Sequence, residues 1–329
     1  MRNTLPPLAY TQQLETGLAG NLGVSVEGSN ASIPGDDSYH SLSSNTLTLP
    51  PIDPYGPSSR WIDVYSRGAD DFSFTVNPID KWIVAKPSSG KISASSGNDV
   101  RVQLSVDWSK APAGSSLASI YVNISSNNYG NFGVPLVQLP VNKTTVPSSF
   151  HGFVESDGTI SIEAEHATRN TSSAKTTYAV IPGYGRTLSG VTLLPVLAES
   201  QQAPSSPRLE YDVYVFSKVS LAKVTVYLGP SLNALPSRPL KYAVAFDDDT
   251  PTVVQYVPST NLGTLPSTWS DTVSKGVWTD TTSHSVQGDG KAHTLKLWAL
   301  EPGVVFQKVV VDLGGVRPSY LGPPESKIV

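Results

Sequence analysis

Cysteine is absent from the 329 residues, so the chain has no disulfide bond, no thiolate metal ligand and no cysteine nucleophile. Charged residues are scarce at 15%, and the net charge is −4. The 23 lysines and arginines form no run that could follow a phosphate backbone, which predicts that nucleic acid is not a partner. No apolar stretch approaches the ~18 residues of a membrane-spanning helix, so no membrane partner is expected.

What the chain does contain is serine, threonine, glycine and proline between short runs in which apolar and polar residues alternate. Such runs begin at Trp61 and are bounded by turn residues, with no helical period between them. They predict an all-β fold made of two β-sandwiches in tandem. We expect an immunoglobulin-like sandwich over residues 59–146 and, because its strands are more numerous and its connections longer, a jelly roll over 150–315.

The two ends of the chain lack this alternation. Residues 1–58 contain one helix candidate, Leu8 to Leu18, and stretches rich in glycine, serine and proline, which predicts an irregular connecting segment. Residues 316–329 are predicted to be an extended tail. The first residues have no apolar region of a signal peptide, yet several Asn-x-Ser/Thr sequons are typical of secreted proteins, and we expect an extracellular location.

Glu163 and Glu165 stand two residues apart in a segment with a strand pattern. Side chains alternate along a strand, so both carboxylates are expected on one face. With Asp312 at the end of the last predicted strand, they could bind a structural Ca²⁺, which prefers six to eight oxygen ligands. A solvent-facing polar edge and a pair of catalytic carboxylates are the alternatives.

Other patterns carry less chemistry. Asp247, Asp248 and Asp249 cannot share one strand face and are interpreted as a solvated turn. The five histidines form no HExxH motif, and no Gly-x-Ser-x-Gly elbow occurs. No residue is therefore assigned a catalytic role.

Aromatic residues in predicted loops are candidates for stacking on sugar rings. Tyr184 lies in a glycine-flanked loop with Arg186, which could meet a carboxylate, and Trp269 and Trp278 lie in a second loop-rich stretch. These four residues are predicted to bind carbohydrate. The alternative is that the aromatic rings close the end of a sandwich.

Several motifs resemble the C-terminal portion of glycoside hydrolase family 115. They are Leu18 to Ser29, Arg60 to Tyr65, Val106 to Trp108, Ser161 to His166, and Asp312 to Ser326. The family consists of xylan α-1,2-glucuronidases, inverting hydrolases whose catalytic domains precede this portion. The resemblance implies a carbohydrate-binding accessory region for xylan or glucuronoxylan, and a chain that is inactive without those domains.

The second predicted sandwich is also similar to carbohydrate-binding modules of families 6 and 35. In those modules an acidic first strand and an aspartate near the end of the last strand hold a structural calcium ion. The resemblance implies this role for Glu163, Glu165 and Asp312.

Two other functions stay open at this stage. In one, the sandwiches form a structural module that docks on the upstream catalytic domains or forms a homodimer, without binding sugar. The other is an independent hydrolase or lyase that uses Glu163 or Glu165.

Overall fold

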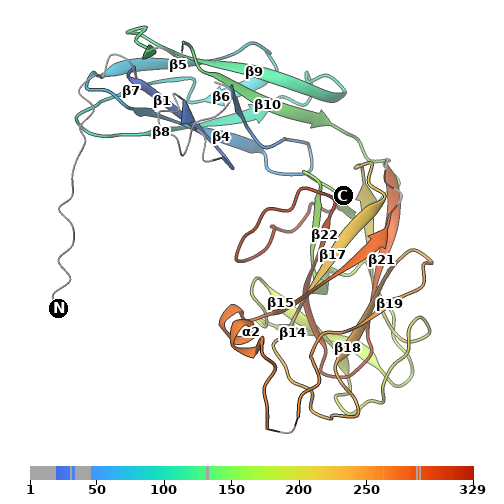
Figure 1. Ribbon diagram of the computed structural model, residues 1–329. Helices are drawn as coiled ribbons and strands as arrows, with labels where there is room; N and C mark the ends of the chain where they lie inside the picture. Colours follow the sequence, from blue (N-terminus) through green and yellow to red (C-terminus); the bar gives the residue numbers. More distant parts are fainter. Residues whose placement is uncertain are drawn as a thin grey trace, which may run out of the picture. The chain divides into compact units, whose positions relative to one another are not determined.

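The computed structural model describes residues 20–29, 32–33, 46–130, 133–261, 263–286, 288 and 290–329. The chain divides into two units, residues 1–144 and 145–329, and each is described by itself (Figure 1). The helix predicted over Leu8 to Leu18 lies outside the described residues. Within them, no helix has both the length and the apolar character needed to cross a membrane.

Unit 1 consists of two five-stranded sheets, A and B. Sheet A has the order β2-β1-β4-β8-β6, and sheet B has the order β3-β10-β9-β5-β7. The strands are β1 (Leu22–Val26), β2 (Ser32–Ile33), β3 (Thr46–Thr48), β4 (Ser59–Ser66), β5 (Phe72–Pro78), β6 (Ile83–Lys86), β7 (Ser89–Ile92), β8 (Val100–Val106), β9 (Gly114–Ile124) and β10 (Leu136–Lys143).

The segment predicted to be irregular, residues 1–58, contains three short strands, β1, β2 and β3. Strand β1 pairs antiparallel with β4, and β3 pairs in parallel with β10. Val24 and Leu47 are fully buried in the core of unit 1. Short strands of this kind are stabilised by partners distant in sequence, which their own residue pattern does not reveal.

Unit 2 consists of two six-stranded sheets, C and D. Sheet C has the order β11-β16-β21-β18-β19, with β13 beside β16, and sheet D has the order β14-β15-β22-β17-β20, with β12 beside β22. The elements are β11 (Phe153–Val154), β12 (Thr159–Glu163), the 3₁₀ turn η2 (Ala164–His166), β13 (Arg169–Asn170), β14 (Thr177–Pro182), β15 (Ser189–Leu194), β16 (Leu209–Val215), β17 (Leu221–Leu228), β18 (Lys241–Phe246), β19 (Thr252–Gln255), α2 (Trp269–Lys275), β20 (Trp278–Ser285), β21 (Lys291–Ala299) and β22 (Val305–Asp312).

One hydrophobic core joins sheets C and D. It contains Tyr211 and Leu297 from sheet C together with Val226 and Val309 from sheet D, all fully buried. Each such side chain contributes about 1.5–3 kcal/mol when it leaves water. The prediction of an all-β chain is confirmed, and the labels immunoglobulin-like and jelly roll stay predictions.

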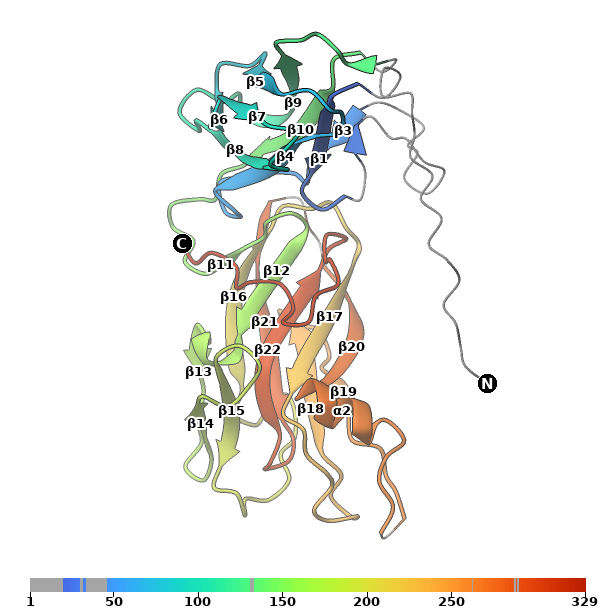
Figure 2. The same ribbon diagram turned by 90° about the vertical axis from the view of Figure 1, so that its left-hand side faces the viewer.

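The C-terminal segment, residues 314–329, folds back onto unit 2 (Figure 2): residues 323–326 contact β12, and residues 327–329 contact β11 and Gly152. The backbone amide of Ser326 donates to the Ser161 carbonyl at 2.8 Å, and the Ser161 amide donates to Ser326 Oγ at 3.0 Å. Gly152 and Val329 exchange two backbone hydrogen bonds. The tail therefore covers part of β12, although the two segments are far apart in the sequence.

Candidate functional site

The two glutamates of the acidic strand do not share a face. Strand β12 ends at Glu163, and Glu165 lies in η2. The physical reason is the edge of β22: its residues Lys308 to Asp312 pair with β12, whereas Val305 and Phe306 pair with β15. Because β15 occupies the rest of that edge, β12 cannot continue past Glu163.

The predicted third ligand is also far away. Asp312 pairs with Thr159 at one end of β12, and Glu163 pairs with Lys308 at the other. Four residues along a strand separate the two positions by about 13 Å. Among the described residues, no three metal-ligating side chains come together. The predicted ligand set is therefore corrected, while bound calcium itself stays a prediction.

Both glutamates have other partners. Glu163 Oε1 lies 3.1 Å from Lys308 Nζ, and Thr187 Oγ1 donates to the same carboxylate at 2.7 Å. Glu165 Oε1 lies 3.6 Å from His166 Nε2. Glu325 of the tail lies 2.8 Å from His166 Nδ1 and accepts the Glu163 amide at 2.9 Å. These contacts join β12, β22 and the tail.

Of the four residues predicted to bind carbohydrate, the two tryptophans lie together. Trp278 and Trp269 are adjacent, with ring centroids 6.3 Å apart, and Trp278 also contacts Tyr256. Trp278 is only 7% exposed, and its indole donates to the Ser231 carbonyl at 3.2 Å. The structure thus places Trp278 in the core, and Trp269 packs partly buried against it.

Tyr184 lies on two glycines. A Cβ atom at Gly229 would stand 2.4 Å from the Tyr184 hydroxyl, and one at Gly190 would stand 2.7 Å from Cδ1 of the ring. Only glycine leaves room for the ring at these positions. Burial raises the pKa of Tyr184 above the ordinary tyrosine value. A tyrosine hydroxyl is protonated at neutral pH in any case and can donate to a ligand.

Arg186 stacks on an aromatic ring of the tail. Its guanidinium carbon lies 3.9 Å from the centroid of Tyr320, and its backbone amide donates to Gln307 Oε1 at 3.1 Å. Arg186 Nε is buried without a hydrogen-bond partner in the protein, and Tyr320 is 64% exposed. Within the described part of the chain, no carboxylate forms an ion pair with Arg186.

We refer to Tyr184, Arg186 and Tyr320 as the Arg186–Tyr320 site. It presents an exposed aromatic ring and a cation whose charge is not neutralised by a carboxylate of the described protein. This combination suits an anionic, ring-shaped ligand, since a guanidinium matches a carboxylate through two parallel hydrogen bonds. Sequence reasoning missed Tyr320, although it stands within the Asp312 to Ser326 motif.

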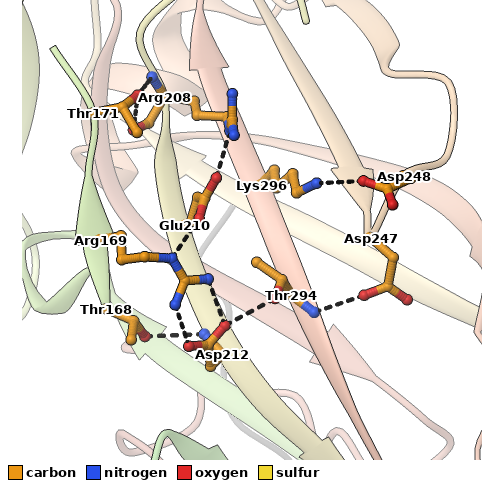
Figure 3. A network of polar contacts seen from close by, with 10 residues as sticks. All are labelled: Thr168, Arg169, Thr171, Arg208, Glu210, Asp212, Asp247, Asp248, Thr294 and Lys296. Carbon is orange, nitrogen blue, oxygen red and sulfur yellow. Dashed lines mark hydrogen bonds and ion pairs between the residues drawn. The ribbon is translucent and has the colours of Figure 1, made fainter.

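The outer face of sheet C carries a different arrangement, a network of paired charges (Figure 3). Arg169 donates two hydrogen bonds to Asp212, at 2.5 and 2.7 Å, and one to Glu210 at 2.6 Å. Arg208 donates to the other oxygen of Glu210 at 2.5 Å. Lys296 lies 3.2 Å from Asp248.

The network shifts the titration of its own members. Burial acts to raise the pKa of Glu210 and Asp212, but hydrogen bonds from the arginines outweigh it, and both pKa values are lowered. Beside this network, Asp247 follows the last residue of β18, has a positive φ of 47° and accepts a hydrogen bond from the Thr294 amide at 2.8 Å. This position agrees with the turn predicted for Asp247 to Asp249.

The fold and the site define an all-β chain whose second unit carries a cationic, aromatic surface. The glycosyl hydrolase family 115 C-terminal domain matches residues 152–325, more than half of the 329 residues. The chain belongs to this family. The resemblance recognised in the sequence is confirmed.

Solved structures with partial similarity include a family GH115 4-O-methyl-α-glucuronidase with specificity for decorated arabinogalactans, at 17% identity and a TM-score of 0.36. The match covers 52% of this chain and 19% of that one, so this chain spans about a fifth of that enzyme's length. A search of curated proteins finds no match.

Two carbohydrate-binding modules are also similar to this chain. The C-terminal family 6 module of a marine laminarinase from Zobellia galactanivorans has 11% identity and a TM-score of 0.31, over 47% of this chain and 98% of that one. A family 35 module from Paenibacillus barcinonensis has 16% identity and a TM-score of 0.28, over 46% and 96%. At these scores the similarity carries no argument about function.

Proposed function

We propose that this chain is a carbohydrate-binding accessory region of a family 115 glycoside hydrolase, and that the Arg186–Tyr320 site binds saccharides bearing a uronic acid. The observation that carries the proposal is the guanidinium of Arg186, stacked on exposed Tyr320 and without an ion pair in the described protein. Membership of the family supports a saccharide as the ligand class.

The chemistry of the site suits glucuronoxylan. A sugar ring can pack its apolar face on the exposed side of Tyr320, while the Arg186 guanidinium binds the uronate carboxylate. The Tyr184 hydroxyl is a further donor to sugar hydroxyls. No catalytic residue is assigned, and the chain is proposed to be inactive without the catalytic domains that precede this region in the family. A polysaccharide ligand supports an extracellular location for the chain.

Calorimetry with two matched ligands tests the proposal: a xylo-oligosaccharide carrying one 4-O-methylglucuronic acid, and the same oligosaccharide without it. We expect the acidic ligand to bind with Kd of about 0.1–1 mM and the neutral one more weakly. Arg186→Met should weaken binding of the acidic ligand at least tenfold, because a charge-assisted hydrogen bond contributes about 1.5–3 kcal/mol.

Two controls locate the effect. Tyr320→Phe keeps the ring and should bind as the wild type does, whereas Tyr320→Ala should not bind measurably. Arg169→Met removes an arginine whose partners are all in the protein and should leave Kd unchanged. Equal affinity for both ligands, or wild-type affinity in both Arg186→Met and Tyr320→Ala, would disprove the proposed site.

An assembly role is the second candidate. Leu188 and Leu321 are exposed and flank the two segments that form the site, and exposed apolar side chains of this kind also occur in protein interfaces. A chain that binds neither ligand but forms a dimer in light scattering, or associates with separately supplied upstream domains, would favour this role. A change of Leu321 to Asp should then abolish the association.

A further inference from the structure

A buried ion pair lies under the C-terminal tail, between β12 and β22. Lys308 is 3% exposed, and its Nζ lies 3.1 Å from Glu163 Oε1. Two carbonyl oxygens of the tail complete its surroundings, those of Pro323 at 3.1 Å and Leu321 at 3.5 Å. A lysine ammonium has three N–H donors and here meets three oxygens. One carboxylate and two carbonyls are also the ligand types that a hard cation prefers.

This ion pair contacts both segments of the Arg186–Tyr320 site. Glu163 accepts a hydrogen bond from Thr187, the residue after Arg186. Lys308 donates to the carbonyl of Leu321, the residue after Tyr320. The loop that carries the guanidinium and the tail that carries the ring are therefore attached to opposite members of a single ion pair.

The surroundings of Glu163 do not fit the calcium site expected from the resemblance. A calcium ion at Glu163 would have to displace the Lys308 ammonium from contact distance, because the two positive charges would repel each other strongly in a buried place. Asp312 pairs with Thr159 at the far end of β12, and Glu165 faces His166. Neither Asp312 nor Glu165 is therefore placed to neutralise a divalent ion at Glu163.

We propose that the Lys308 ammonium takes the place of a metal ion in this fold, and that the Glu163–Lys308 pair positions Arg186 against Tyr320. Lys308 and Glu163 are positioning residues that do not touch the ligand. The positive charge that holds the tail and the loop belongs to the Lys308 side chain of β22. Both segments therefore keep their conformation without a divalent cation. The effect on saccharide affinity rests on the proposed function, whereas the effect on the tail and the loop does not.

The first test is thermal unfolding of the wild-type chain in EDTA and in millimolar CaCl₂. We expect the same Tm in both solutions. A Tm that rises with calcium and falls with EDTA would overturn the proposal. This measurement needs no saccharide.

The second test is hydrogen exchange by mass spectrometry, which follows peptides over residues 183–189 and 316–329. The test variant is the double change Glu163→Gln and Lys308→Met, which removes both charges and leaves neither buried alone. We expect exchange to become about tenfold faster in both peptides, because local opening is no longer opposed by the ion pair. Lys296→Met, whose partner Asp248 is fully exposed, is the matched control and should exchange as the wild type does.

Wild-type exchange in both peptides of the double variant would refute the positioning role. Kd for the acidic oligosaccharide should rise about tenfold in this variant, in step with the faster exchange. If the wild type binds no uronate at all, the proposed function fails. The exchange and calcium measurements still decide the role of Lys308 in that case.

Discussion

The ion pairs on the two outer faces of unit 2 differ in how deeply they are buried. On sheet C, the side chain of Arg169 is 47% exposed where it pairs with Asp212 and with the buried carboxylate of Glu210. On sheet D, Lys308 and Glu163 meet beneath the tail, with little access to water. Exposed pairs are screened and contribute little, whereas a buried charge that loses its partner is costly. Burial of the charges, more than the number of ion pairs, is therefore expected to decide how much each pair contributes to stability.

The same comparison explains why the proposed ligand-binding arginine is Arg186 and not Arg169. Arg169 forms three hydrogen bonds to carboxylates of the protein, so a ligand would have to compete with them. Arg186 has an aromatic ring as its neighbour and no such competitor in the described chain. An arginine that the fold leaves without a carboxylate is the one available to an anionic ligand.

The largest effect on stability is expected from Lys308→Met. It leaves the Glu163 carboxylate buried without a counter-charge, which should lower the free energy of unfolding by about 3–5 kcal/mol. Lys296→Met on sheet C should cost less than about 1 kcal/mol, because its partner is exposed. Urea denaturation of both variants measures the difference. An equal loss of unfolding free energy in the two variants would contradict the view that burial decides the contribution of an ion pair.

Arg169→Met is expected to have an intermediate effect. It breaks the hydrogen bonds to Asp212 and Glu210, but Arg208 still pairs with Glu210, and the free energy of unfolding should fall by about 1 kcal/mol. The loss should shrink at high salt, since exposed pairs are screened. A loss that is independent of salt in urea denaturation would show that this network behaves as a buried one.

A smaller effect is expected from acidification. The lowered pKa values of Glu210 and Asp212 mean that the folded state favours their charged forms. This contribution is complete above the ordinary carboxyl pKa of about 4 and is lost as the pH falls through the lowered values. Urea denaturation between pH 7 and pH 3 should show a steeper acid loss in the wild type than in Arg169→Met. Parallel curves would rule out this coupling.

The smallest effect on stability is expected from Tyr320→Ala. The ring is largely exposed, so the free energy of unfolding should change by less than about 0.5 kcal/mol. Urea denaturation measures this change on the same scale as the Lys308 variant. A loss above 2 kcal/mol would mean that Tyr320 is part of the tail's attachment rather than a free surface.

Much of the fold could be predicted from alternation along single strands. The run from Arg60 to Val64 alternates because Arg60, Ile62 and Val64 are buried, and it forms β4 as predicted. Strands β1 and β3 could not be predicted because they are too short to show a pattern of their own. They are recognised only by their pairing with other strands, as where Thr46 of β3 pairs with Leu136 of β10. The pair Glu163 and Glu165 was assigned to one face because the sequence does not reveal where β15 replaces β12 on β22.

The residues of the proposed site could be predicted only in part. Tyr184 and Arg186 were identified because glycines flank them, whereas Trp278 looks the same in sequence whether it faces water or the core. Tyr320 was missed because the tail has no regular period, and only its docking along β12 places the ring on Arg186.

By itself, the sequence determined the all-β class, the absence of thiol chemistry and the motifs of family 115. These properties are local, since alternation and residue type can be read along a few neighbouring positions. Only the tertiary structure decided which cation faces Glu163 and which arginine stays without a carboxylate. Those outcomes depend on contacts between residues more than a hundred positions apart, such as Glu163 with Lys308 and Arg186 with Tyr320.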